Sequence, residues 1–196
     1  MKTGIAVCFP GTGFTCKEAL FERLGADYAA LEYDIIKLDF SHIPFREIES
    51  LEEAIAVAQR AVKRQLSHVA FAEYDDVVFL SKSLGTILAI EHDNANDICA
   101  RHLLLTPLNK TLLQIRPKTK VIAMVLGTQD RFLTGRALAS FCEERGIRYC
   151  LIDGVNHSLK DDVDPERTAR IIIQIAGLCN GQENEEGASS LLGCRA

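Results

Sequence analysis

Short apolar runs alternate with amphipathic segments along most of the chain. The apolar runs are predicted to be six strands, covering residues 5–9, 33–40, 76–80, 101–107, 121–126 and 148–152. The segments between them have apolar residues at helical spacing, and the predicted helices cover residues 16–24, 51–71, 84 to about 94, 137–144 and 165–178. This alternation predicts an α/β fold, with a doubly wound, mainly parallel sheet of about six strands and helices on both faces.

Three helix starts are marked by local signals. Thr15 and Glu18 have the spacing of a capping box, and so do Ser50 and Glu53. Asp164 followed by proline is typical of an N-cap with proline at the first helical position. Beyond residue 180 the composition shifts to Gly, Glu, Asn and Ser. The sequence therefore predicts one domain over residues 1–180 and a disordered C-terminal tail over residues 181–196.

Composition and charge exclude several classes of function. The 196 residues are 47% hydrophobic and 25% charged, which is ordinary for a globular domain, and the net charge is −5. Lys and Arg are scattered, so no nucleic-acid partner is expected. No apolar run approaches the ~20 residues of a membrane span, and the N-terminus does not look like a signal peptide. We therefore expect a cytoplasmic protein without a membrane partner.

Seven cysteines are present, and none forms a C-x-x-C pair or has zinc-ligand spacing with a histidine. Most lie in apolar strand or helix contexts. They are interpreted as buried thiols in a reducing compartment, and neither a metal nor a cofactor is expected.

The segment S-K-S-L-G at 81–85 joins the strand at 76–80 to the following helix. Ser83 lies at the turn, where its side chain would be lifted out of the sheet edge beside a helix N-terminus. Small residues at positions 81 and 85 permit a tight turn. A strand-to-helix turn without any chemistry is the alternative interpretation of this segment alone.

Two further polar residues follow later strands. Asp130 lies just beyond the strand at 121–126, and His157 lies beyond the strand at 148–152. The carboxyl ends of parallel strands meet at one edge, so the two side chains and Ser83 are predicted to converge there. A neutral imidazole can take the proton of a serine hydroxyl, and a carboxylate behind it stabilises the imidazolium. The Leu84 N–H at the helix start could then bind the oxyanion.

The elbow at Ser83, the turn containing Asp130 and the G-x-x-H-S-L turn containing His157 resemble those of the α/β-hydrolase superfamily over residues 4–178. The elbow departs from G-x-S-x-G in having Ser81 as its first member. The resemblance implies a small, reduced version of the fold without a lid, since only about a dozen residues after Thr106 are available for a cap. It also implies that Thr12 is the second oxyanion donor. The implied function is a serine hydrolase that cleaves an ester, thioester or similar acyl bond of a small substrate through an acyl-Ser83 intermediate.

Several alternatives stay open from the sequence. The chain could be a non-catalytic binding protein on the same scaffold, or a flavodoxin-like nucleotide or phosphate binder that uses the Gly-rich loop at 11–13. Asp153 competes with Asp130 as the acidic partner of His157. His42 and His102 are interpreted as a surface residue and a structural residue. The acyl group, the leaving group and the oligomeric state cannot be read from the sequence.

Overall fold

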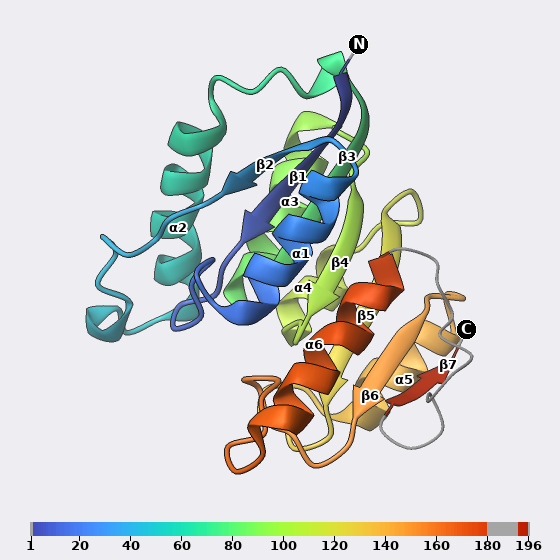
Figure 1. Ribbon diagram of the computed structural model, residues 1–196. Coiled ribbons are helices and arrows are strands. Elements are labelled where there is room, and N and C mark those ends of the chain that lie inside the picture. The colour runs from blue at the N-terminus through green and yellow to red at the C-terminus, as the bar shows by residue number, and fades with distance from the viewer. Residues whose placement is uncertain (1, 180–191, 196) are drawn as a thin grey trace.

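The computed structural model describes residues 2–179 and 192–195, which form one sheet covered by helices on both faces (Figure 1). The strands are β1 (Lys2–Phe9), β2 (Tyr33–Lys37), β3 (Tyr74–Lys82), β4 (Arg101–Leu105), β5 (Lys120–Gly127), β6 (Tyr149–Ile152) and β7 (Leu192–Arg195). The helices are α1 (Ala19–Ala30), α2 (Leu51–Leu66), α3 (Leu84–Asn96), α4 (Asn109–Gln114), α5 (Gly135–Glu143) and α6 (Pro165–Cys179). Among these helices, none combines the length and apolarity needed to cross a bilayer.

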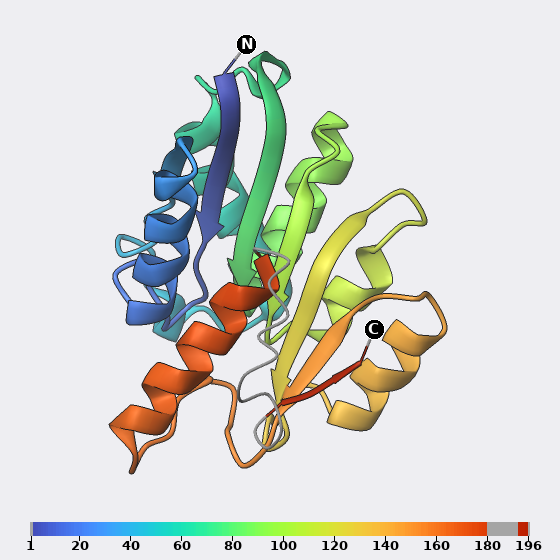
Figure 2. The same cartoon turned by 45° about the vertical axis from the view of Figure 1, so that its right-hand side comes forward.

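The strand order is β2-β1-β3-β4-β5-β6-β7. All pairs from β2 to β6 are parallel, and β7 pairs antiparallel with β6. The predicted doubly wound, mainly parallel sheet is therefore confirmed. Figure 2 shows how strongly this sheet twists from β1 to β6.

The core lies in layers on the two sides of the sheet. Apolar residues of α1 and α6, such as Phe21 and Ile175, pack on the face seen in Figure 1. α2 and α3 cover the other face over β1 and β3, and α5 covers it over β5. Because both faces are covered, the central strands have almost no exposed residues, which explains their unbroken apolar runs.

The strand order reverses between β1 and β3. The chain leaves β1 towards β2 on one side, and leaves β3 towards β4 on the other. The carboxyl ends of β1 and β3, where the order reverses, are the place at which α/β proteins usually bind ligands.

Two of the three helix-start predictions are confirmed. The Ser50 hydroxyl accepts from the Glu53 N–H at 3.1 Å, and Asp164 Oδ1 accepts from the Arg167 N–H at 3.0 Å. The capping box at Thr15 is wrong, because α1 begins only at Ala19 and its N-cap residue makes no side-chain cap.

The predicted end of the helix at residue 71 is also wrong. α2 ends at Leu66, and Phe71 begins a short 3₁₀ turn over Phe71–Glu73. Phe71 still covers the sheet, with its ring 5.8 Å from that of Phe79. Its packing against the sheet, where it is partly buried, maintains the apolar spacing after the helix has stopped, which is why the pattern overestimates the helix.

The structure differs from the predicted disordered tail at Leu192–Arg195. These residues form β7 and pair with β6. β6 would otherwise be the edge of the sheet, where unpaired N–H and C=O groups can accept another strand. The other residues of the predicted tail, 181–191 and 196, lie outside the described residues.

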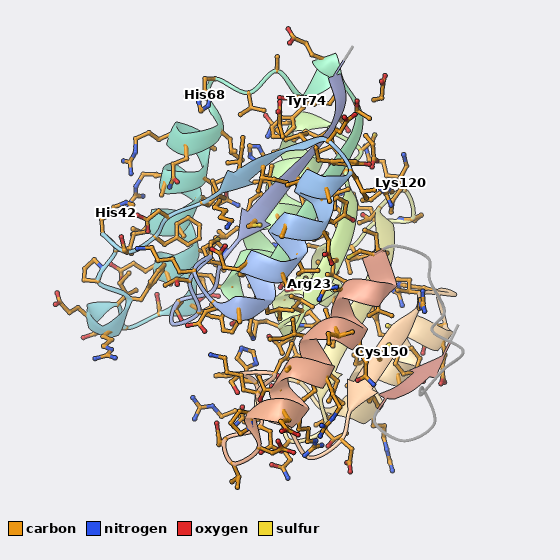
Figure 3. The ribbon with its side chains drawn as sticks, in the orientation of Figure 1. Arg23, His42, His68, Tyr74, Lys120 and Cys150 are labelled. Carbon is orange, nitrogen blue, oxygen red and sulfur yellow. The ribbon has the colours of Figure 1, made fainter. Side chains whose placement is uncertain are left out.

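Cys150 on β6 is disulfide-bonded, so its interpretation as a thiol is wrong. In the β6–β7 register its Cα pairs with that of Cys194, and Figure 3 marks Cys150 on β6. The free cysteines among the described residues are Cys8, Cys16, Cys99, Cys142 and Cys179. Stable disulfides are typical of oxidising compartments, and the cytoplasmic location stays a prediction.

A buried pair of side chains fixes the turn between α3 and β4. His102 is fully buried, and its Nε2 lies 2.8 Å from Asp93 Oδ2. Asp93 Oδ1 accepts from the Cys99 N–H at 2.8 Å and from the Ala100 N–H. Burial raises the pKa of Asp93, but these hydrogen bonds lower it by more, so that it lies below its ordinary value.

We expect Asp93→Ala to lower the free energy of unfolding by about 2–3 kcal/mol at pH 7, because His102 and two N–H groups lose their acceptor. The folded-state pKa of Asp93 is depressed, so its contribution is present above the unfolded value of about 4 and lost as the pH falls through the folded value. In urea unfolding, the difference in the free energy of unfolding between wild type and variant should therefore be smaller at pH 3 than at pH 7. A difference that is unchanged or larger at pH 3 would contradict this account, and His68→Ala, at an exposed position, is the control.

Candidate active site

Ser83 lies in a strained turn between β3 and α3. Its φ of 54° and ψ of −122° are unusual for a residue with a side chain. The turn requires Gly85, because a Cβ there would lie only 2.1 Å from the Phe9 carbonyl oxygen. Ser81, which stands at the first glycine position of the elbow, is fully buried and donates its hydroxyl to the Leu103 carbonyl at 3.1 Å. A serine is therefore accommodated at this position with its polar group satisfied.

The structure brings Ser83, His157 and Asp130 together at the carboxyl edge of the sheet. His157 Nε2 lies 2.8 Å from Ser83 Oγ, and His157 Nδ1 lies 2.6 Å from Asp130 Oδ2. The three residues follow β3, β5 and β6, so the parallel register of the sheet is what places them side by side. One imidazole thus connects a hydroxyl to a carboxylate.

Asp130 is fixed and charged. Its side chain has no exposed surface, and Oδ1 accepts from the Phe132 N–H at 2.8 Å. Burial raises the pKa of Asp130, but the hydrogen bonds from His157 and from the Phe132 and Leu133 N–H groups lower it by more. The carboxyl group is consequently ionised at neutral pH and can orient the Nδ1–H of His157.

The two residues predicted to donate to an oxyanion lie close to Ser83, Leu84 in the chain and Thr12 in space. Leu84 begins α3, and its N–H donates to no carbonyl or side chain within residues 2–179 and 192–195. The loop after β1 runs beside Ser83, since a Cβ on Gly11 would lie 3.2 Å from Ser83 Cβ. Thr12 follows in that loop, is exposed, and has no acceptor for its N–H in the described part of the chain. N–H groups at a helix start and an adjoining loop can bind a developing negative charge.

The other candidates do not join this group. Asp153 accepts from the Thr128 hydroxyl at 3.1 Å, whereas His157 bonds to Asp130. His42 is exposed and lies 3.1 Å from an Arg64 nitrogen, on the loop after β2 where Figure 3 marks it. His102 pairs with Asp93, as described above. Among the described residues no three His, Cys, Asp or Glu side chains gather as a metal site would require.

The Gly-rich loop offers less to a phosphate than its composition indicates. The Gly11 N–H donates to the Phe14 carbonyl at 3.1 Å, which closes the loop on itself. One of the N–H groups that a phosphate cradle would use is therefore already occupied.

Sequence reasoning missed two residues beside the site. Phe132 is 45% exposed, and its ring lies 4.6 Å from the His157 ring in an edge-on arrangement. Lys82 directly precedes Ser83 and is 1% exposed. A lysine at the end of an otherwise apolar strand was the available signal for Lys82, whereas nothing local distinguishes Phe132 from a loop residue.

A short helix in the connection after β4 was also missed. α4 is tied to the elbow, because Thr111 Oγ1 lies 2.6 Å from Thr86 Oγ1, and Thr86 donates to the Ser83 carbonyl at 2.7 Å. With only six residues, α4 is too short for a helical period to show in the sequence.

No protein-family model and no curated protein matches the sequence. Solved structures match nearly the whole chain. Est1E from Butyrivibrio proteoclasticus superposes with a TM-score of 0.63 at 14% identity, over 92% of this chain and 88% of that one. Esterase 2 from Thermogutta terrifontis, in a form phosphorylated by paraoxon, superposes with a TM-score of 0.62 at 17% identity, over 92% of this chain and 81% of that one. A serine hydrolase homologue from Coxiella burnetii superposes with a TM-score of 0.57 at 12% identity, over 90% of this chain and 84% of that one.

Identities this low carry information about the fold, and the matches extend over most of both chains in each case. The strand order and the strand-to-helix turn at Ser83 agree with the same architecture. The chain has the α/β-hydrolase fold.

Proposed function

We propose that the protein is a serine hydrolase that cleaves an ester, thioester or similar acyl bond through an acyl-Ser83 intermediate. The observation that supports this most strongly is the hydrogen-bonded chain from Ser83 Oγ through His157 to Asp130, at 2.8 and 2.6 Å. Such a chain is needed to activate a hydroxyl whose own pKa makes it a weak nucleophile.

In the proposed reaction, Ser83 Oγ attacks the acyl carbon while His157 Nε2 takes the hydroxyl proton. The ionised Asp130 holds Nδ1–H and stabilises the imidazolium. The Leu84 and Thr12 N–H groups donate to the oxygen that becomes negative. His157 then gives its proton to the leaving group, and a water molecule activated by the same imidazole releases the acyl group from Ser83.

Reaction of the full chain with a fluorophosphonate probe tests the proposal. Esterase 2 of Thermogutta terrifontis, which is structurally similar, is phosphorylated by paraoxon, and we expect an activated Ser83 to react with an organophosphorus probe. We expect one adduct per chain, located on Ser83 by peptide mass spectrometry, and turnover of short p-nitrophenyl esters that the adduct abolishes. A chain without an adduct on Ser83 would instead favour a non-catalytic binding protein on this scaffold.

The exposed ring beside His157 supports a substrate with an apolar portion. We expect Phe132→Ala to raise KM for esters with aromatic or long acyl groups by about 3–10-fold, because about 1 kcal/mol of apolar contact is lost. The KM for acetyl esters should change by less than twofold. Leu31→Ala is the matched control, since Leu31 is 54% exposed but follows α1 at the opposite edge of the sheet. Equal changes for short and long acyl groups would contradict a role for Phe132 in specificity.

A further inference from the structure

Lys82 is a buried lysine next to the proposed nucleophile. It is the last residue of β3, and only 1% of it is exposed. Its Nζ donates to Thr106 Oγ1 at 2.9 Å and to the main-chain carbonyl of His157 at 2.6 Å. It also lies 4.8 Å from the centre of the Phe14 ring. One amino group therefore contacts the loops that follow β1, β4 and β6.

This burial is costly. Lysine is among the residues least often fully buried, because its charged form loses its hydration. No carboxylate of the described residues lies within ion-pair distance of Nζ, and burial lowers the pKa of Lys82 to about 7. A methionine would fill the same space without that cost. What a lysine offers here, and an apolar residue does not, is an amino group that donates to two oxygen atoms, Thr106 Oγ1 and the His157 carbonyl.

The bond from Lys82 to the His157 carbonyl holds a residue that lies in a loop. His157 belongs to residues 153–164, the connection between β6 and α6, which has no regular structure of its own beyond turns. Its ring is fixed at Nδ1 by Asp130, but that bond alone leaves the imidazole free to move with its backbone. The bond from Lys82 fixes the backbone of His157 to the end of β3, directly before Ser83.

We propose that Lys82 is a positioning residue, whose amino group ties the His157 carbonyl to the nucleophile elbow and so keeps the imidazole within reach of Ser83 Oγ. The proposal rests on the proposed function, since it assigns Lys82 a role in the same reaction. Thr106 and Phe14 hold Nζ in place from the two other loops.

Lys82→Met tests the proposal, because methionine keeps the length and apolar stem of the side chain and removes the donors. We expect kcat for p-nitrophenyl esters, measured well below Tm, to fall about 100-fold, as it does when reacting groups shift by ~1 Å. KM should stay within threefold. The rate of inactivation by the fluorophosphonate should fall by the same factor as kcat, because both need the imidazole at Ser83.

Lys160→Met is the matched control. Lys160 lies in the same connection and 5.4 Å from the same Phe14 ring, but its side chain is 40% exposed and pairs with Glu18. We expect its kcat to stay within threefold of wild type. A similar loss of kcat in both variants would overturn the specific role of Lys82.

A second readout separates positioning from stability. In wild type, the Nδ1 proton of His157, bonded to Asp130, should give a low-field NMR signal at neutral pH, and Lys82→Met should shift or broaden it. A variant with lower Tm but unchanged kcat and an unchanged signal would overturn the proposal and leave Lys82 a purely structural residue.

Wild-type measurements keep the proposal testable if Lys82→Met does not fold. With ¹⁵N-labelled lysine, the Nζ protons of Lys82 should exchange slowly with water and show contacts to the Hα of His157. Fast exchange without such contacts would overturn the proposal. These NMR signals do not depend on turnover. A failure of the proposed hydrolase function would instead be seen as the absence of an adduct on Ser83, so the two failures can be told apart.

Discussion

Replacing Ser83 with alanine is expected to lower kcat for short p-nitrophenyl esters by about 10⁶-fold, to the rate supported by the remaining site. Ser83 Oγ lies 2.8 Å from His157 Nε2, and the alanine variant has no atom at this position that can form the acyl intermediate. Fluorophosphonate labelling should disappear at the same time. Stopped assays with wild type and variant, purified side by side, measure the ratio.

Ser81→Ala is the matched control for this variant. Ser81 is two residues away in the same turn, but its hydroxyl donates to the Leu103 carbonyl inside the sheet. We expect unchanged labelling and a kcat within threefold of wild type, with a loss of about 1 kcal/mol in the free energy of unfolding. Labelling that persists in Ser83→Ala and disappears in Ser81→Ala would show that the nucleophile has been assigned to the wrong serine.

Asp130→Asn is expected to lower kcat by about 10⁴-fold while leaving the fold intact. The amide has the shape of the carboxylate, but it can donate to Nδ1 and so favour the imidazole tautomer that presents an N–H, in place of a lone pair, to Ser83. It also removes the negative charge that stabilises the imidazolium. Steady-state kinetics give the change in kcat, and circular dichroism checks that the variant is folded.

Two comparisons sharpen the Asp130 result. Asp153→Asn should stay within threefold of wild type, because Asp153 bonds to Thr128 and is exposed. The double variant Ser83→Ala/Asp130→Asn should be no slower than Ser83→Ala alone, because residues that act as one unit are not additive. If Asp153→Asn lost more activity than Asp130→Asn, the assignment of the acid would be reversed.

The elements predicted best are those with strong local signals. Unbroken apolar runs such as residues 121–126 identify strands that are covered on both faces, and all six predicted strands are present. The predicted helix starts are correct where the side chain caps its own helix, as at Ser50 and Asp164. At Thr15 the same spacing failed, because the hydroxyl accepts from the Lys17 N–H in a local turn and α1 starts later.

Features that depend on distant segments were not predictable from a local pattern. β7 pairs with β6, and Cys150 is disulfide-bonded on that same strand. The burial of Lys82 depends on loops that follow three different strands. The segments that these contacts join, β6 with β7 and Lys82 with the three loops, lie far apart in the sequence.

The sequence by itself determined the alternation of strands and helices, the turn at Ser83 and the chain order of a hydroxyl, a carboxylate and an imidazole. These follow from residue type, periodicity and short-range spacing, which act over a few residues. Only the tertiary structure decided that Asp130 rather than Asp153 bonds to His157, that Phe132 lies against the imidazole, and that Lys82 joins the loops around it. These contacts depend on strand order and loop conformation, which are set by packing between segments far apart in the chain.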